Sequence, residues 1–493
     1  MRARRSRQNA ACSEGGRPAP APRAGWRARG GGGRPQALLA VALLAASVLP
    51  GAARAHQEIP VERAQLGNGL TVLVHEDRAL PIVSLYLFYR AGSRNERPGI
   101  TGISHLFEHM MFNGGAQSRG KFDEIIEGSG GSTNGYTTRD FTAYMESFPP
   151  SALAPVLWLE ADRMRALAIT PENLEQERGI VKEERRLRVD DDPGGRLYEE
   201  IYLAAYVAST YRWNPVGFMA DLDQITLDDA TSYFRTYYAP NNATLVLAGA
   251  IAPAEGFALA ERYFGDIPPQ EPPRRVVNAE PPQQGPRYVR YHMAAELPAL
   301  AIAFHGVPAT HPDRPALDVL ETILGDGESS RLYRSVVRGR ELAAGVDVSF
   351  NWGMDAELFW VYAQVRPGKD VRALESAILA ELGRAHARAA DERELRKAKN
   401  VLQADYVRGL KTVSGKANQL GFYETVFGDY GAMFRQVELW EAVTAADVQR
   451  VARTYLDERA RTTVELVPEG TGARAARARG AMPAPATPGE GMR

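Results

Sequence analysis

Two histidines and one glutamate, in the order His-x-x-Glu-His, are the residues of this sequence best suited to chemistry. His105 and His109 are four residues apart, so they share one face if the segment is helical. Two neutral imidazoles at this spacing can bind one zinc ion, which accepts nitrogen ligands in a tetrahedral shell. Glu108 lies on the same side and can take a proton from a zinc-polarised water. The three residues could instead be hydrogen-bonded polar groups at the edge of a core. A third ligand elsewhere in the chain would favour the metal site over this alternative.

A strongly helical run over residues 171–189 offers candidates for this third ligand. Glu177 and Glu184 are seven residues apart and therefore lie within about 20° of each other around a helix. Ile180 and Val181 fall between them, which predicts that this face points inward. A carboxylate on an inward face needs a partner, because burying it alone is costly.

Glu184 is therefore the predicted third metal ligand, and Glu177 is predicted to support it. Glu183 points toward the flank of the same helix, where a solvated acidic side chain is the simpler interpretation. A set of two histidines and one glutamate fits Zn2+, although such sites discriminate poorly against manganese and cobalt.

The composition is ordinary for a globular protein of more than one domain. The chain has 493 residues, of which 44% are hydrophobic and 24% are charged. Its formal net charge of −1 hides an asymmetry, because residues 1–55 carry ten arginines and one glutamate. The remainder has 49 basic and 59 acidic residues, a net charge of −10. An acidic body gives no support to nucleic-acid binding.

Residues 1–55 predict an export signal that is removed. A basic region precedes an apolar run at 37–49, and the tripeptide at 53–55 matches the small-x-small cleavage pattern. The run is too short to span a bilayer comfortably, so we expect no stable membrane span and a periplasmic or secreted chain that begins near His56. An arginine-rich organelle presequence or a start codon chosen too far upstream would also fit. The one cysteine, Cys12, lies in this segment.

Strand and helix patterns are mixed along the chain. The predicted strands cover residues 66–74, 81–89, 141–145, 243–249 and 298–304, and the predicted helices cover 151–166, 171–189, 195–206, 228–237 and 314–324. They lack the regular alternation of a doubly wound sheet, so the sequence predicts an α+β fold.

The pattern restarts after a proline-rich stretch at 267–287, which suits an interdomain linker. The segment that begins at Arg97 overlays the segment that begins at Arg314, which indicates an internal duplication. Thr322 then takes the place of His105, so the second copy cannot hold a metal. The predicted organisation is a targeting segment at 1–55, a catalytic zinc-binding unit at 56–266, the linker at 267–287, a second unit without metal at 288–470 and a disordered tail at 471–493.

Together these motifs resemble the pitrilysin family of zinc metallopeptidases, or inverzincins, and in particular its short bacterial and mitochondrial-processing-peptidase-like branch. The resemblance rests on the motif at 105–109 followed by Glu177 and Glu184, and it covers roughly residues 60–470. It implies two similar α/β units, each an antiparallel-rich sheet with helices packed on one side. The family's zinc ligands correspond to His105, His109 and Glu184, its general base to Glu108 and its outer glutamate to Glu177.

The resemblance also implies substrate-binding residues. Asn134, Gly135 and Tyr136 resemble the edge strand on which a substrate lies as an added strand. Arg338 matches an arginine that completes the catalytic chamber from the second half or from a partner subunit. The tyrosine expected seven residues later is Gly345 in this chain.

The predicted function is that of a zinc-dependent endopeptidase acting on peptides or unstructured protein segments. Because Gly345 cannot replace a tyrosine, we expect a heterodimer with a non-catalytic paralogous subunit, with a homodimer as the alternative. Two other functions are compatible with the fold: a structural or assembly subunit without activity, and a module that holds peptides without cutting them. The intact set of ligands argues against the structural subunit.

Overall fold

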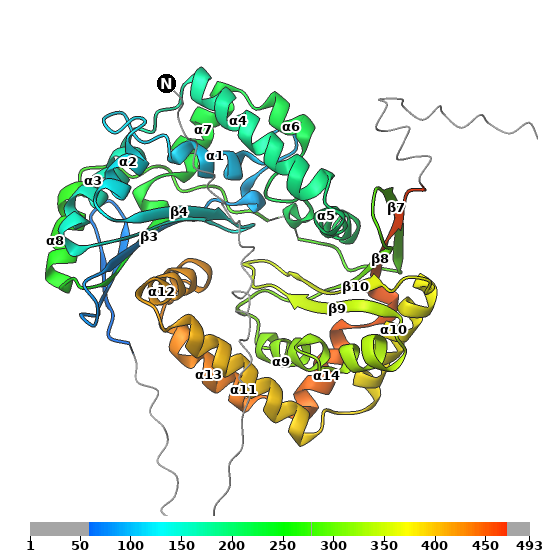
Figure 1. The fold of residues 1–493 in the computed structure, drawn as a ribbon. Helices are drawn as coiled ribbons and strands as arrows, with labels where there is room; N and C mark the ends of the chain where they lie inside the picture. Colours follow the sequence, from blue (N-terminus) through cyan, green and yellow to red (C-terminus); the bar gives the residue numbers. More distant parts are fainter. Residues whose placement is uncertain (1–58, 278, 471–493) are drawn as a thin grey trace, which may run out of the picture.

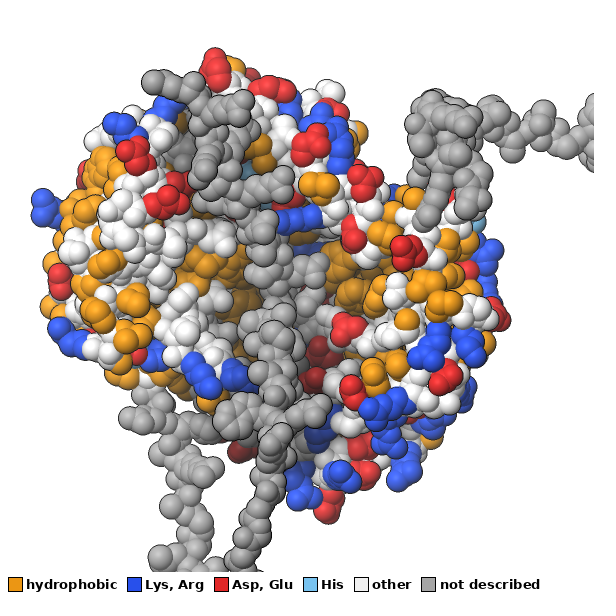
Figure 2. All heavy atoms as spheres, in the orientation of Figure 1, with side chains coloured by type: hydrophobic (Ala, Val, Ile, Leu, Met, Phe, Trp, Pro, Cys, Tyr) orange, Lys and Arg blue, Asp and Glu red, His pale blue; other side chains and the backbone are white. Residues whose placement is uncertain are grey.

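The computed structural model describes residues 59–277 and 279–470, which form two β-sheets with helices packed around them (Figure 1). The predicted targeting segment and the predicted tail lie outside these described residues. Within the described ranges, each helix is too short or too polar to cross a membrane. Figure 2 shows acidic side chains interspersed with basic ones on one face of the molecule.

The first sheet has six strands in the order β1-β2-β6-β3-β5-β4. Its strands are β1 (Glu62–Gln65), β2 (Thr71–Glu76), β3 (Val83–Tyr89), β4 (Ser132–Thr137), β5 (Thr142–Phe148) and β6 (Ala243–Gly249). β2 and β6 pair in parallel, whereas β3 pairs antiparallel with β5 and β6, and β4 pairs antiparallel with β5. β4 is therefore an edge strand, as the resemblance predicts.

The second sheet repeats this topology with five strands in the order β7-β11-β8-β10-β9. Its strands are β7 (Arg287–Met293), β8 (Ala299–His305), β9 (Ala343–Phe350), β10 (Leu358–Val365) and β11 (Thr462–Pro468). The parallel pair β7/β11 corresponds to β2/β6, and each antiparallel pair has its counterpart. The predicted duplication into two similar units is confirmed, and β1 is an addition to the first unit.

Helices surround both sheets. In the first unit they are α1 (Ile103–Met111), α2 (Phe122–Gly128), α3 (Leu153–Arg165), α4 (Pro171–Arg185), α5 (Pro193–Ala205), α6 (Met219–Gln224), α7 (Leu227–Tyr237) and α8 (Pro253–Phe264). In the second unit they are α9 (Arg314–Gly325), α10 (Val371–Ala387), α11 (Glu392–Gly409), α12 (Val413–Phe427), α13 (Ala432–Ala442) and α14 (Ala445–Tyr455). Two π-helical segments, η3 (Arg186–Asp190) and η6 (Tyr333–Gly339), interrupt the pattern.

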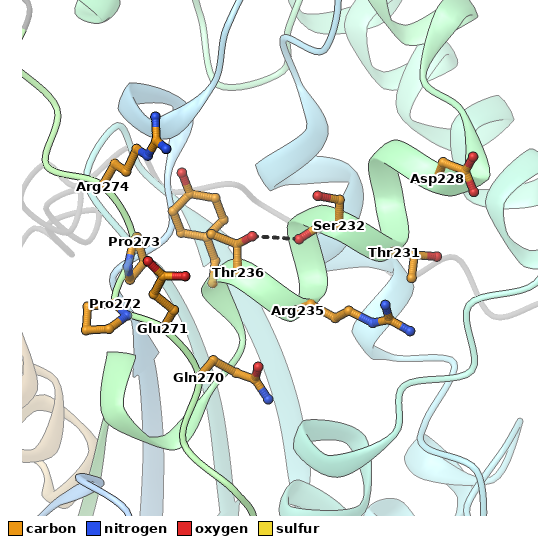
Figure 3. A pocket seen from close by; sticks show the side chains of 11 residues that line it. Asp228, Thr231, Ser232, Arg235, Thr236, Gln270, Glu271, Pro272, Pro273 and Arg274 are labelled. Carbon is orange, nitrogen blue, oxygen red and sulfur yellow. Dashed lines mark hydrogen bonds between the residues drawn. The ribbon is translucent and has the colours of Figure 1, made fainter.

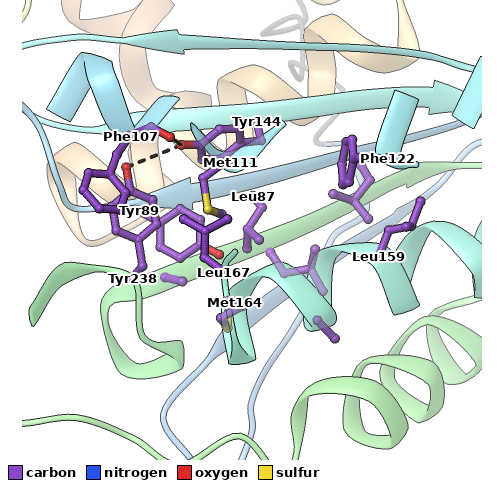
Figure 4. Packing of buried hydrophobic residues seen from close by; sticks show 14 of the residues in the cluster. Leu87, Tyr89, Phe107, Met111, Phe122, Tyr144, Leu159, Met164, Leu167 and Tyr238 are labelled. Carbon is purple, nitrogen blue, oxygen red and sulfur yellow. Dashed lines mark hydrogen bonds between the residues drawn. The ribbon is translucent and has the colours of Figure 1, made fainter. Parts of the chain in front are cut away.

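The core of the first unit lies between one face of its sheet and the helix that carries the two histidines. Phe107 and Met111 of α1 pack against Leu87 and Tyr89 of β3 (Figure 4). All four side chains are buried, and each such burial contributes about 1.5–3 kcal/mol of hydrophobic stabilisation. The apolar face of α1 therefore anchors the helix, and the histidine-bearing face is presented to α4.

The opposite face of each sheet is covered by a helix from the other unit. Leu420 of α12 packs with Phe88 of the first sheet, and Ile201 of α5 packs with Ala301 of the second sheet. The approach of α12 is close, since a Cβ on Gly421 would lie 2.0 Å from the ring of Phe88. The prediction of helices on one side is thus incomplete: both faces are covered, and the units exchange helices.

Candidate metal centre

Helix α1 holds the two histidines one turn apart on one side. Their ring centroids are 4.9 Å apart, and His105 is almost fully buried. The start of the helix is fixed by Glu96, whose carboxylate accepts the backbone N–H groups of Gly102 and Ser104 at 2.9 Å each. These two N–H groups would otherwise lack partners at a helix start, so Glu96 fixes where α1 begins.

Helix α4 lies beside α1 and brings Glu184 to the histidines. Oε2 of Glu184 is 3.7 Å from Nε2 of His105 and 3.3 Å from Nε2 of His109. One ligand atom from each of the three residues lies within 4.8 Å of the others. Among the described residues this is the one group of three or more His, Cys, Asp or Glu side chains close enough to share an ion.

The electrostatics of two of the three side chains, His105 and Glu184, suit a cation. Burial, together with the neighbouring charge of His109, lowers the pKa of His105 to about 3, so its imidazole is neutral. Burial alone would raise the pKa of Glu184, but the hydrogen bond from His109 and the charges of His105 and Arg188 lower it to about 2. Burial lowers the pKa of His109, but the hydrogen bonds to Glu177 and Glu184 outweigh burial and raise this pKa to about 9, so a metal would have to displace a proton from this imidazole.

Glu177 contacts His109 but does not belong to the group of three possible ligands. Its Oε2 is 3.7 Å from Nδ1 of His109, and its Oε1 accepts a hydrogen bond of 3.1 Å from Nδ2 of Asn113. The carboxylate thus contacts the ring nitrogen that faces away from Glu184. A partner on that nitrogen fixes the orientation of the ring, which is the supporting position predicted from the sequence.

Along α4, Glu177 and Glu184 face the histidines, whereas one of the two apolar residues predicted on the same face does not. Glu183 is 67% exposed in its side chain and pairs with Arg186, away from the histidines. Val181 is fully buried as predicted, but Ile180 is 46% exposed and does not lie on the inward face. The buried stripe of α4 is centred on Glu177 and Val181, and Ile180 falls beyond its edge.

Glu108 lies between the histidines and the edge strand β4. Oγ1 of Thr137, the last residue of β4, donates a hydrogen bond of 2.6 Å to Oε2 of Glu108. A Cβ on Gly135 would lie 3.2 Å from Cγ of Glu108, so the strand passes directly beside this side chain. Burial raises the pKa of Glu108. Thr137 directly follows the predicted Asn134–Tyr136 segment, but its hydrogen bond to Glu108 was not among the predictions.

The side chains along β4 point in different directions. Asn134 is exposed, and its side-chain oxygen accepts the backbone N–H of Gly135. The hydroxyl of Tyr136 donates a hydrogen bond of 2.7 Å to Asn418 on α12. Tyr136 therefore faces the second unit, whereas Gly135, Thr137 and the backbone of β4 lie beside Glu108.

Arg338 and Gly345 lie in the second unit. Arg338 belongs to η6, is largely exposed and pairs with Glu328 of the same unit. Gly345 lies on the edge strand β9, and a Cβ there would meet no atom within 4 Å. A Cβ at Gly345 would therefore face open space, and the sequence supplies no side chain there.

A separate pocket of about 700 Å³ lies between α7 and the stretch that follows α8 (Figure 3). Its lining includes Asp228, Ser232 and Arg235 of α7 together with Glu271 and Arg274. None of the predicted site residues line it, and its lining mixes both signs of charge. The pocket is therefore distinct from the group on α1 and α4.

The chain is similar to known proteins over most of its length. The zinc protease PqqE of Helicobacter pylori is 31% identical over 413 residues, which cover 83% of this chain and 93% of the relative. The family models described as insulinase (peptidase family M16) and peptidase M16 inactive domain match residues 71–217 and 224–402. The chain belongs to the M16 family of peptidases.

Solved structures give the same M16 fold. The crystal structure of a protease from Helicobacter pylori superimposes with a TM-score of 0.80 at 30% identity, covering 83% of this chain and all of that chain. The periplasmic protease PqqL of Escherichia coli superimposes with a TM-score of 0.69 at 18% identity, and 52% of its chain is covered. The pitrilysin-like family and the two-unit fold predicted from the sequence are thus confirmed.

Proposed function

We propose that this M16 protein is a zinc-dependent endopeptidase that hydrolyses peptides or unstructured protein segments. The observation that carries the proposal is the convergence of His105, His109 and Glu184 within 4.8 Å, with Glu108 and the edge strand β4 beside them. A structural subunit of the same fold needs neither a ligand set nor a buried glutamate between it and an open strand edge. The name zinc protease, carried by the Helicobacter pylori relative, supports zinc as the metal.

The donor set fits a zinc ion. Two imidazoles and one carboxylate are a common protein contribution to a catalytic zinc site, which keeps a further position open. Neutral His105 and ionised Glu184 are in the protonation states that a metal requires, and His109 would release its proton when the metal binds. When bound, zinc supplies a Lewis acid for the scissile carbonyl and the attacking water.

The protein's own residues carry the remaining steps. Glu108, oriented by the hydroxyl of Thr137, accepts the proton from the attacking water and later donates it to the leaving amine. A raised pKa suits this double role, because the carboxyl group must both gain and lose a proton near neutral pH. The open edge of β4 binds the substrate backbone as an added strand, with Gly135 leaving room beside Glu108.

The proposal is tested with a quenched fluorescent peptide of unstructured sequence. We expect cleavage by the purified protein, loss of cleavage after treatment with a chelator and recovery when zinc is restored. Binding of the peptide without cleavage would indicate a peptide-holding module instead. Neither binding nor cleavage, with any metal present, would indicate a structural subunit.

We further propose that the chain works with a partner. Gly345 offers no side chain where the resemblance expects a tyrosine, and Arg338 is engaged with Glu328 of its own unit. The Escherichia coli neighbour, of which this chain covers 52%, is about twice as long as the matched region. A paralogous subunit with both arginine and tyrosine would complete the chamber, whereas a second copy of this chain would not.

The partner proposal predicts low activity for the isolated chain. One missing donor to a developing oxyanion costs roughly 10²–10³-fold in rate, so co-expression with the product of an adjacent paralogous gene should raise cleavage by about that factor. Gly345→Tyr, which has room at its site, should partly replace the partner in the isolated chain. Full cleavage by the isolated chain, unchanged by partner or substitution, would contradict the proposal.

We also propose export to the periplasm with removal of residues 1–55, based on the basic region, the apolar run and the cleavage pattern. Amino-terminal sequencing of the mature protein should begin near His56. A mature protein that retains residues 37–49 would contradict this.

A further inference from the structure

An arginine outside the predicted site, Arg188, contacts the predicted ligand Glu184. Nη1 of Arg188 lies 2.5 Å from Oε1 of Glu184, whereas Oε2 of the same carboxylate faces both histidines. The two oxygens of Glu184 are thus divided between two kinds of partner. We propose that Arg188 is a positioning residue for the metal centre: it holds Oε1 so that Oε2 alone is presented to a metal. This inference rests on the metal site proposed above.

The place of Arg188 is fixed by close packing. It lies in the π-helical segment η3, which continues directly from α4. A Cβ on Gly195, near the start of α5, would lie 1.8 Å from the backbone oxygen of Arg188, so this contact tolerates only glycine. Asp192 caps α5 by accepting the N–H of Gly195. The turn that presents the guanidinium to Glu184 is therefore a tightly built part of the fold.

Ion pairs of Arg185 also stabilise the turn between α4 and α5 that contains Arg188. Arg185 is buried and pairs with Glu199 of α5 at 2.8 Å and with Asp190 of η3 at 3.2 Å. Arg185 thus ties α4, η3 and α5 together. Arg188 projects from this junction with a side chain that is 39% exposed, beside a Glu184 side chain that is 15% exposed. A guanidinium at this position reaches the carboxylate without being part of the core.

Two effects of Arg188 on a bound metal oppose each other. Its positive charge repels a cation held by Glu184, but half-exposed charges are screened by water and salt. Its ion pair fixes the carboxylate, and removing a partner of a ligating carboxylate typically lowers metal affinity by about 10–100-fold. Because the guanidinium is partly exposed while Glu184 is largely buried, we expect the positioning effect to exceed the repulsion.

The test is the zinc affinity of the purified protein, measured by competition with a chromogenic chelator rather than by activity. Arg188→Met, which removes donor and charge, should weaken binding by about 10–100-fold. Arg188→Gln keeps an amide donor four residues from Glu184 and should stay within about threefold of the original affinity. Arg186→Met is the matched control, because Arg186 is two residues away and pairs with exposed Glu183.

Unchanged or tighter binding in Arg188→Met would overturn the proposal, since the arginine would then be a bystander or a purely repulsive charge. Equal losses in Arg188→Met and Arg188→Gln would also overturn it, because the amide donor of glutamine would then have restored none of the affinity. The melting temperature of each metal-free variant shows whether the fold is intact. Failure of the unmodified protein to bind zinc would instead contradict the proposed function.

Discussion

Replacing Glu108 by glutamine is expected to lower the rate of peptide hydrolysis by at least ~10²-fold and to leave metal content and substrate binding unchanged. Glutamine has nearly the same shape but cannot accept a proton. Its amide can still meet Thr137, so the local packing stays the same. The loss should appear in kcat, with little change in KM, because the group acts on the reacting water and not on the ground-state complex.

The matched control for this variant is Glu124→Gln on α2, an exposed glutamate that is turned to solvent. It should hydrolyse peptide at the original rate. Metal content of both variants is measured on the same samples, so that a loss of turnover is not confused with a loss of metal. Full activity of Glu108→Gln would remove this residue from the mechanism.

The second large effect is expected from the three predicted ligands. The purified protein should carry about one zinc per chain, and His105→Ala, His109→Ala and Glu184→Gln should each lose most of it. The reason is geometric, since the ligand atoms of all three residues lie within 4.8 Å of one another and each substitution removes one. Elemental analysis of the purified variants measures the metal directly.

Glu183→Gln is the matched control on the same helix. Its side chain is exposed and pairs with Arg186, so the variant should keep its metal. Loss of zinc in Glu183→Gln together with its retention in Glu184→Gln would show that the wrong glutamate of this adjacent pair was chosen. Both circular dichroism and melting temperature check that the variants remain folded.

The site residues could be predicted from the sequence where their spacing within one helix places them on the same face. The spacing of His105 and His109 and the seven-residue spacing of Glu177 and Glu184 are properties of single helices, and α1 and α4 bring them together as expected. Ile180 shows the limit of the same argument. Around the helix axis, Ile180 lies about 60° from Glu177, in the same direction as Glu184. The buried side chains of α4 extend in the other direction, through Val181.

Contacts between distant segments could not be predicted in this way. Thr137 reaches Glu108 from a strand 29 residues away, and Glu96 fixes the start of α1 from a loop ahead of it. Neither residue belongs to a pattern that one sequence reveals. Arg188 is only four residues from Glu184, but an (i, i+4) acid–base pair on a charged helix is usually a surface ion pair. Whether the pair of Arg188 and Glu184 has a role beyond the surface depends on the partners of Oε2 of Glu184, which are the two histidines.

The exchange of helices between the two sheets has a consequence for folding. A sheet that lost the helix lent by the other unit would expose apolar side chains such as Phe88 on one sheet and Ala301 on the other. Neither half is thus a self-sufficient module, and we expect one cooperative unfolding transition. The stretch between α8 and β7 is in addition tied to the loop after α5, where Glu280 accepts three successive backbone N–H groups. A protease nick in that stretch would leave two fragments that stay associated through the exchanged helices, and their stability would then depend on protein concentration.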